Sequence, residues 1–318
     1  MGIEFRNVGK TYPDGTTAVR DFSLDVPSRS TAVLLGSSGC GKTTLLRMVN
    51  RMVDPTEGAV LVDGEDVAQA APVGLRRRIG YVMQSAGLLP HRRVIDNVAT
   101  VPRLNGADRR EARSRAQEML EIVGLDASLG RRYPDQLSGG QQQRVGVARA
   151  LAGDPHILLM DEPFGAVDPL VRRELQTEIM RIRTELEKTV VFVTHDVEEA
   201  LTLGDQVVVL REGGEVAQTG TPRELVEEPA DAFVARFLGI GTGERSLSAH
   251  RRATGGWAIE DPNGRPLGVV EAGALSSGAT SAPGTVPPAH EAAPPGSNQL
   301  GHGRSPGQRR PSGDEPGA

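Results

Sequence analysis

The sequence predicts an α/β fold, in which buried strands alternate with amphipathic helices. Three short runs are entirely apolar, Ala32–Leu35, Ile157–Met160 and Val190–Val193. Such runs are typical of strands that are buried on both faces of a largely parallel sheet. The first run leads into a glycine-rich turn, Gly36–Thr44, which is followed by apolar residues at helical spacing. This order of strand, glycine loop and helix is characteristic of α/β proteins.

Composition narrows the class of protein further. The chain has 318 residues, 38% of them apolar, which is enough for one large or two modest domains. Its formal charge of −5 indicates no overall basic field, so we expect no nucleic-acid partner. Cys40 is the one cysteine, which excludes a disulfide framework and suits a reducing compartment. We see no signal peptide and no apolar run of spanning length, so we expect any link to a membrane to pass through another protein.

The first third of the chain is predicted to be rich in strands. Residues 3–26 contain short strands with a turn at Pro13–Gly15, and a strand and turn follow within Gly58–Val67. Ile79–Met83 is a further strand that ends at Gln84. Helical spacing after the glycine loop predicts a helix that continues to Val53, with these apolar residues: Leu45, Leu46, Val49, Met52 and Val53.

Helices dominate the middle of the chain. Residues 85–137 are predicted to form a helical insertion in the sheet domain, with an amphipathic helix that includes Ala112, Ala116, Met119, Leu120 and Val123. A helix begins after Ser138, and a long amphipathic helix runs from Leu170 to Leu186. A hairpin at 207–216 and a helix through Phe233 and Phe237 then close the domain near Gly239. Residues 276–318 contain eight prolines and eight glycines and are predicted to be disordered.

The glycine loop carries the strongest chemical signal. Gly36–Thr44, with the sequence GSSGCGKTT, matches the phosphate-binding pattern G-x-x-x-x-G-K-[ST]. Glycines allow the backbone to turn tightly and to direct its N–H groups at phosphate oxygens, and the following helix presents its positive end to the same anion. Lys42 can reach terminal phosphates, and the Thr43 hydroxyl can hold Mg²⁺. Within this turn, Cys40 is either a small residue that fills space or, less simply, a reactive thiol.

Two further stretches add to this signal. Ser138, with Gly139 and Gly140 at a helix start, is either a second anion site or an ordinary helix N-cap. Asp161 and Glu162 follow a buried strand directly. Adjacent carboxylates in such a place are costly unless they bind a cation or a reacting water, the alternative being a solvated strand end.

Taken in order, Gly36–Thr44, Gln84, Leu137–Gln141, Asp161-Glu162 and His195 resemble the motifs of the nucleotide-binding subunit of an ABC transporter. The resemblance covers about residues 1–240. It implies a P-loop NTPase cassette with a RecA-like mixed sheet, an antiparallel β subdomain and a helical subdomain at about 85–153. Residues 241–275 would then be a linker, followed by the tail at 276–318.

The resemblance also implies roles for single residues, with ATP and Mg²⁺ as cofactors. Tyr12 would stack on adenine, Glu162 would act as general base, and His195 would contact the γ-phosphate. Thr43, Gln84 and Asp161 would arrange Mg²⁺, and Lys42 and Gln84 would join Glu162 and His195 in catalysis. The phosphates would be held by the loop: Gly36, Ser37, Ser38, Gly39, Cys40, Gly41, Lys42, Thr43 and Thr44.

A second copy of the chain is the first partner that the resemblance implies. Ser138, Gly139, Gly140 and Gln141 would cap the ATP that is bound to the other copy, and Asp168 would lie in the loop that crosses this dimer. Gly165 and Val167 stand where serine and leucine are more usual, which is a mild departure that leaves Asp168 in place.

Within the family, three segments of the chain look most like importers of glycine betaine, choline, proline and related osmoprotectants. These are RMVNRMVDPTEGAVLVDGEDV, LRRRIGYVMQSAGLLPHRRVIDNVATVPRL and FVTHDVEEALTLGDQVVVL. The likeness implies an integral membrane permease, contacted through Gln84–Leu104, and indirectly an extracellular substrate-binding protein. The chain would then lie at the cytoplasmic face of the cell membrane. An importer ATPase for polar amino acids or another small solute, a soluble ABC ATPase and a GTPase switch are the rival interpretations.

Residues 249–275 are harder to interpret. The stretch Trp257–Val270 resembles one hairpin of a CBS module, a regulatory module that many osmoprotectant cassettes carry as a pair. Too little chain remains for a full pair, so the segment is either a partial module or an unrelated strand–turn–strand with Asn263-Gly264 at its turn.

Overall fold

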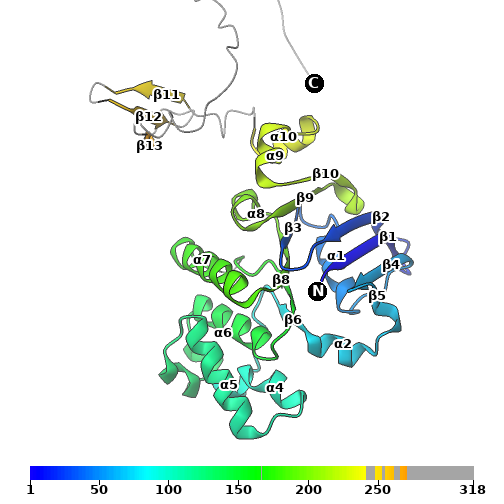
Figure 1. Cartoon of the computed structure of the whole chain (residues 1–318), viewed down its shortest axis with the longest axis vertical. Helices are drawn as coiled ribbons and strands as arrows, with labels where there is room; N and C mark the ends of the chain where they lie inside the picture. Colours follow the sequence, from blue (N-terminus) through cyan, green and yellow to red (C-terminus); the bar gives the residue numbers. More distant parts are fainter. Residues whose placement is uncertain (166, 241–247, 253–254, 261–265, 271–318) are drawn as a thin grey trace, which may run out of the picture.

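The computed structural model describes residues 1–165, 167–240, 248–252, 255–260 and 266–270. A six-stranded sheet forms the centre, with a four-stranded antiparallel sheet on one side and a group of helices on the other (Figure 1). The prediction of an α/β fold with a mixed sheet, an antiparallel β part and a helical part is confirmed. Within the described ranges, no helix is both long and apolar enough to cross a bilayer.

The central sheet has the order β10-β9-β3-β8-β7-β6. Its strands are β3 (Thr31–Gly36), β6 (Ile79–Val82), β7 (Ile157–Asp161), β8 (Thr189–Thr194), β9 (Gln206–Leu210) and β10 (Val216–Gly220). All pairs are parallel except β9 with β10, which forms the predicted hairpin. Leu35 lies opposite Thr194, and Asp161 lies opposite Val193, so the carboxyl ends of β3, β8 and β7 share one edge.

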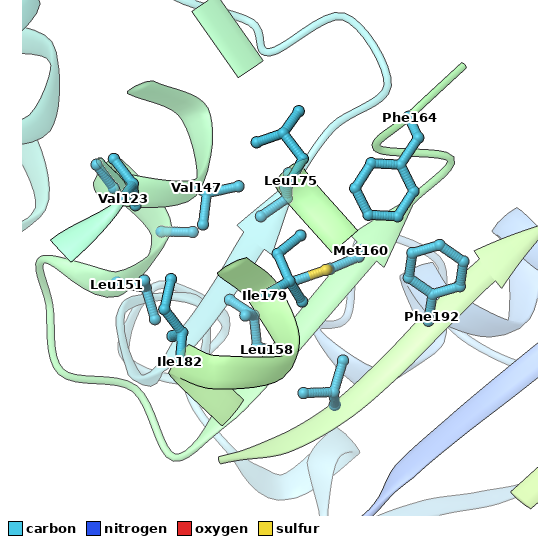
Figure 2. Packing of buried hydrophobic residues seen from close by; sticks show 14 of the residues in the cluster. Val123, Val147, Leu151, Leu158, Met160, Phe164, Leu175, Ile179, Ile182 and Phe192 are labelled. Carbon is cyan, nitrogen blue, oxygen red and sulfur yellow. The ribbon is translucent and has the colours of Figure 1, made fainter. Parts of the chain in front are cut away.

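The central strands contribute to two hydrophobic cores because successive side chains point to opposite faces of the sheet. Leu34 and Leu159 pack toward α1 (Lys42–Val49) and the antiparallel sheet. Leu35 and Met160 pack toward the helical part. In that second core Phe164 and Phe192 lie side by side with ring centroids 5.6 Å apart, at one side of a cluster that includes Met160, Leu158 and the side chains of two helices (Figure 2). Burial on both sides explains why the central residues of these strands are apolar.

The antiparallel sheet has the order β2-β1-β4-β5. Its strands are β1 (Ile3–Thr11), β2 (Thr17–Val26), β4 (Glu57–Val62) and β5 (Glu65–Asp66). The rings of Phe5 and Phe22 meet edge to face, with centroids 5.2 Å apart. Both rings belong to the hydrophobic core that also contains the buried residues of α1. The short helix α2 (Pro72–Arg78) connects this sheet to β6.

The helical part follows β6. It consists of α3 (Val94–Val98), α4 (Thr100–Leu104), α5 (Arg109–Ile122) and α6 (Gly139–Leu151), with 3₁₀ turns at Ala127–Arg131 and Pro134–Gln136. The predicted apolar face of α5 is buried. The long helix α7 (Pro169–Leu186) begins after β7 and lies beside α6 in Figure 1. The division of the chain at 85–153 and 240 stays a prediction.

The remaining elements lie toward the carboxyl end. They are α8 (Val197–Leu203), α9 (Pro222–Glu227) and α10 (Ala232–Phe237), with a 3₁₀ turn at Glu212–Gly214. A separate antiparallel sheet follows, in the order β11-β12-β13, made of Ser248–Arg251, Trp257–Glu260 and Pro266–Val270. Its second and third strands lie within Trp257–Val270, the stretch predicted to be either part of a CBS module or an unrelated strand–turn–strand, and the choice between the two stays a prediction. The Asn263-Gly264 turn and the predicted tail at 276–318 lie outside the described residues.

The helix that follows the glycine loop is shorter than its sequence pattern predicts. It ends at Val49, and the extension to Val53 is wrong. Arg51 adopts a φ of 55°, in the left-handed region, which ends the helix. The Asn50 side chain accepts a hydrogen bond from the N–H of Met52, and the Met52 side chain is 52% exposed. The apolar residue Met52 stands at helical spacing, but it does not extend the helix by another turn.

Candidate functional site

The candidate site lies where four neighbouring strands of the central sheet end. The glycine loop leaves β3, His195 follows β8, Asp161 and Glu162 end β7, and Gln84 follows β6. These strands are adjacent and parallel, so residues from four distant parts of the sequence converge at one edge. This edge is where open α/β sheets generally hold their ligands.

The glycine loop wraps around the head of Lys42. The Lys42 side chain is buried, and Nζ donates hydrogen bonds to the carbonyl oxygens of Gly36 at 2.8 Å and Ser37 at 2.7 Å. Gly41 has a φ of 109°, and a Cβ on it would lie 2.4 Å from the carbonyl oxygen of Ala18, so only glycine fits there. Gly41 also gives α1 no side-chain cap, which leaves the first N–H groups of the helix available to an anion.

Thr43 and Asp161 form the second part of the site. Thr43 Oγ1 donates a hydrogen bond of 2.8 Å to Asp161 Oδ1. The other carboxylate oxygen accepts one of 3.1 Å from the Tyr81 hydroxyl and lies 3.9 Å from the Arg47 guanidinium. Burial raises the pKa of Tyr81, which keeps the phenol protonated as a donor. A threonine hydroxyl beside a buried carboxylate is a set of hard oxygen ligands, which suits Mg²⁺.

Glu162 forms the third part, and its backbone is held in an uncommon conformation. Its φ is 44°, and its N–H donates to the carbonyl oxygen of Val193 at 3.0 Å. Glu162 Oε2 accepts a hydrogen bond of 3.2 Å from Gln84 Nε2 and lies 3.3 Å from His195 Nδ1. A non-glycine residue in this region is strained, and such strain is common at functional sites. The observed bond of Gln84 is to Glu162 and not to the Thr43–Asp161 pair.

Tyr12 and Cys40 lie at the margin of the loop. Tyr12 is half-buried, with its hydroxyl 3.5 Å from Thr44 Oγ1 and Lys10 Nζ 5.3 Å from its ring centroid. Cys40 is 1% exposed, and its sulfur lies 2.7 Å from where a Cβ on Gly36 would be. Its position favours the interpretation of Cys40 as a residue that fills the turn.

The serine–glycine turn and Asp168 lie at the N-termini of two neighbouring helices, α6 and α7. Ser138 caps α6 and shares reciprocal hydrogen bonds with Gln141, the side-chain and backbone pattern of a capping box. A Cβ on Gly140 would lie 2.5 Å from Val171 in the first turn of α7, and Asp168 caps that helix. None of the hydrogen bonds among the described residues joins these positions to the glycine loop. The structure thus brings together the loop, Gln84, Asp161, Glu162 and His195, but not the Ser138 turn.

Some residues at this edge were not expected from the sequence. Tyr81 and Arg47 contact Asp161 from β6 and α1, and Thr194 and Glu199 support the segment that carries His195. A tyrosine within a predicted strand and an arginine in a predicted helix are ordinary features. Their proximity to Asp161 follows from the order of the strands, which the residues alone do not specify.

The fold and this site define a P-loop α/β protein with an antiparallel β part and a helical part. A profile of the family described as "ABC transporter" matches residues 19–165. The glycine betaine uptake system ATP-binding protein YehX of Escherichia coli K12 is 48% identical over 247 residues, which is 77% of this chain and 80% of YehX. The chain therefore belongs to the ABC transporter family, within its group of ATP-binding proteins.

Two more comparisons place the chain within this family. The choline transport ATP-binding protein OpuBA of Bacillus subtilis is 46% identical over 237 residues, covering 74% of this chain but only 62% of OpuBA. The chain thus spans about three fifths of the length of that relative. A solved structure, the dimeric post-hydrolysis state of the cassette MJ0796 bound to ADP and Pi, has a TM-score of 0.64 at 34% identity. That match covers 70% of this chain and 99% of the cassette.

Proposed function

We propose that this protein is an ATPase that powers an ABC importer of quaternary-amine osmoprotectants. The observation that carries the proposal is the convergence of Lys42, the Thr43–Asp161 pair and the Glu162–His195 pair at one sheet edge. Phosphoryl transfer depends on positioning and charge neutralisation more than on covalent catalysis, and this site offers both. The uncapped N–H groups of α1 and the buried Lys42 fit a polyphosphate, and the Thr43–Asp161 oxygens fit Mg²⁺.

Each residue then has a definite task. Lys42 and the N–H groups of the loop bind the β- and γ-phosphates, while Tyr12 lies against the adenine. When bound, Mg²⁺ supplies charge neutralisation at the phosphates, through Thr43 and Asp161. Glu162 accepts a proton from the attacking water at Oε2, and His195 holds that carboxylate from the other side.

The Ser138 turn requires a second copy of the chain. It begins α6 in the helical part, and none of the hydrogen bonds among the described residues joins it to the glycine loop, yet it is a helix N-terminus of the kind that binds anions. We propose that two copies pair so that this turn and Asp168 of each copy close over the nucleotide of the other. The dimeric state of MJ0796 with ADP and Pi supports this arrangement.

The membrane partner is proposed to dock beside Gln84–Leu104, which would place the chain at the cytoplasmic face of the membrane. A hollow of about 370 Å³ opens there, lined by five arginines and His91 but by only one carboxylate, Asp96. Leu88 and Leu89, which precede His91 closely in the sequence, are half-buried. A permease segment with apolar and acidic side chains would complement this surface.

A pair of substitutions tests the docking surface. Leu88→Glu with Leu89→Glu should abolish transport while the isolated protein keeps its basal ATPase activity. Val73→Glu, at a residue of α2 that is 60% exposed, is the matched control and should leave transport unchanged. Unchanged uptake in the double variant would contradict the assignment of this surface.

The transported solute is proposed from the names of the relatives, because the cassette does not contact the solute. The decisive experiment reconstitutes the protein with its permease and binding protein in proteoliposomes. ATP hydrolysis should rise with glycine betaine or choline and not with a panel of amino acids. Stimulation by an amino acid alone would favour the rival importer, and co-purification with ribosomes rather than membranes would favour a soluble ATPase.

A further inference from the structure

Arg172 connects two loops of the proposed site that are far apart in sequence. It lies in the first turn of α7, and its N–H donates a hydrogen bond of 2.8 Å to the carbonyl oxygen of Asp168. Its guanidinium reaches the segment after β8, with Nη1 3.4 Å from Asp196 Oδ2 and Nε 3.9 Å from Glu199 Oε1. One residue therefore contacts both the loop of Asp168 and the segment that carries His195.

The His195 segment is held by the same acidic groups. Thr194 Oγ1 donates to Glu199 Oε2 at 2.6 Å and accepts from the N–H of Asp196 at 3.0 Å. Asp196 Oδ1 accepts from the N–H groups of Glu198 and Glu199 and so caps α8. His195 lies between Thr194 and Asp196, so its backbone follows any shift of these two side chains.

The contact between Arg172 and Glu199 differs from an ordinary surface ion pair. Glu199 is buried, with a side chain only 6% exposed, and the Arg172 side chain is 31% exposed. The Nε atom of Arg172 is buried without a hydrogen-bond partner, at 3.9 Å from the carboxylate. A small movement of α7 toward α8 would convert this contact into a hydrogen bond, whereas a movement away would break it. A charge pair with one buried member responds more strongly to such changes than a pair on the open surface, because water screens it less.

We propose that Arg172 is a positioning residue that transmits the position of the Asp168 loop to His195. This inference rests on the proposed dimer, in which Asp168 meets the second copy. When the partner moves the Asp168 loop, the first turn of α7 moves with it, and Arg172 shifts Asp196 and Glu199. His195, whose Nδ1 lies 3.3 Å from Glu162, then changes its place relative to the base. The two sites of the dimer are thereby coupled.

Kinetics separate this role from a purely structural one. Arg172→Ala should lower kcat on the order of tenfold and reduce the Hill coefficient for ATP to about one, with KM within about twofold of the wild type. Arg172→Lys should rescue part of the effect, since an ammonium is a single point charge that reaches one carboxylate where the guanidinium reaches two. Arg173→Ala is the matched control, because Arg173 is exposed and its side chain makes no hydrogen bond or ion pair with any residue that the structure describes.

A second variant tests the partner group. Glu199→Gln keeps the size of the side chain and its bond to Thr194 but removes the charge that faces Arg172. If the two residues act through one contact, the double variant Arg172→Ala with Glu199→Gln should be no slower than the worse single variant. Full additivity of the two losses in kcat would overturn the proposed path through Glu199.

Hydrogen exchange of the nucleotide-free protein tests the contact independently of hydrolysis. Arg172→Ala should speed amide exchange across 194–203, and Arg173→Ala should not. A wild-type protein that hydrolyses no ATP would contradict the proposed function. Hydrogen exchange would still show whether Arg172 holds the segment that carries His195. Wild-type exchange, kcat and Hill coefficient in Arg172→Ala would overturn the inference.

Discussion

Thr43 Oγ1 donates a 2.8 Å hydrogen bond to Asp161 Oδ1 across 118 positions of sequence. The bond joins the first turn of α1, at the end of the glycine loop, to the end of β7. Asp161 is 8% exposed, and its two oxygens share the donors Thr43 and Tyr81. A carboxylate that is buried here without these donors would be costly, so Asp161 is held by its neighbours and is not a solvated strand end.

The charge of Asp161 should matter more than its hydrogen bonds. We expect Asp161→Asn to lower the Mg²⁺-dependent ATPase rate by more than about 100-fold, because even indirect supports of a metal site typically cost 10- to 100-fold. Tyr81→Phe removes the 3.1 Å bond to Oδ2 but leaves the charge and Thr43, so it should cost only a few-fold. Steady-state rates over a Mg²⁺ titration check both. Equal losses in the two variants would contradict the metal role.

Two glycines of the loop should differ in their tolerance of alanine. Gly39 and Gly41 both have positive φ, 83° and 109°, so alanine strains the backbone at either by about 1–2 kcal/mol. Only at Gly41 does the new Cβ meet another atom, the carbonyl oxygen of Ala18 at 2.4 Å. Urea unfolding should therefore show a clearly larger loss for Gly41→Ala than for Gly39→Ala. Equal losses would mean that the close approach does not constrain the loop.

Asn97 should hold the segment beside the proposed docking surface. Its buried side chain accepts a hydrogen bond from the Leu89 N–H at 2.7 Å and donates to the carbonyl oxygens of Leu89, Arg92 and Arg93. Asn97→Ala leaves these groups without partners, at about 1–3 kcal/mol for each that stays buried. Unfolding free energy should fall, and trypsin should cut faster after Arg92 and Arg93. The exposed Asn105→Ala is the control, and identical proteolysis of the two variants would contradict this role.

Glu199 should make stability depend on pH. Burial raises its pKa above the ordinary 4.5, with Asp196 adding to the shift and Arg172 opposing it. Between 4.5 and the raised value, the folded state binds more protons than the unfolded state, so this group's contribution to stability falls as pH rises through that window. In Glu199→Gln this contribution is gone. The variant's stability relative to the wild type, measured by urea unfolding, should therefore improve as pH rises above 4.5, and the opposite trend would contradict the assignment.

Local patterns in the sequence predicted much of this structure. Apolar runs located β3, β7 and β8 because those strands are buried on both faces, and the glycine loop located the start of α1. Other features are not marked by such local patterns. The helix after the loop ends early because Arg51 leaves the helical region, although Met52 and Val53 are apolar. The strand β11 was not expected, since all its residues are exposed and it shows no apolar alternation.

The candidate site was likewise predicted only in part from the sequence. The loop, the Asp161-Glu162 pair and His195 could be predicted from the sequence because each follows a recognisable strand. It could not show that Tyr81 and Arg47 reach Asp161, or that Arg172 reaches Asp196 and Glu199. Such contacts are set by strand order and by the position of the first turn of α7 beside the start of α8. They become visible only when the chain is folded.

Sedimentation of the Glu162→Gln variant tests the central proposal most directly. Without the base, ATP should stay bound, and each copy's Ser138 turn should close over the nucleotide of the other copy. The account predicts a dimer with saturating ATP and a monomer with ADP. A Glu162→Gln protein that binds ATP and still sediments as a monomer would contradict it.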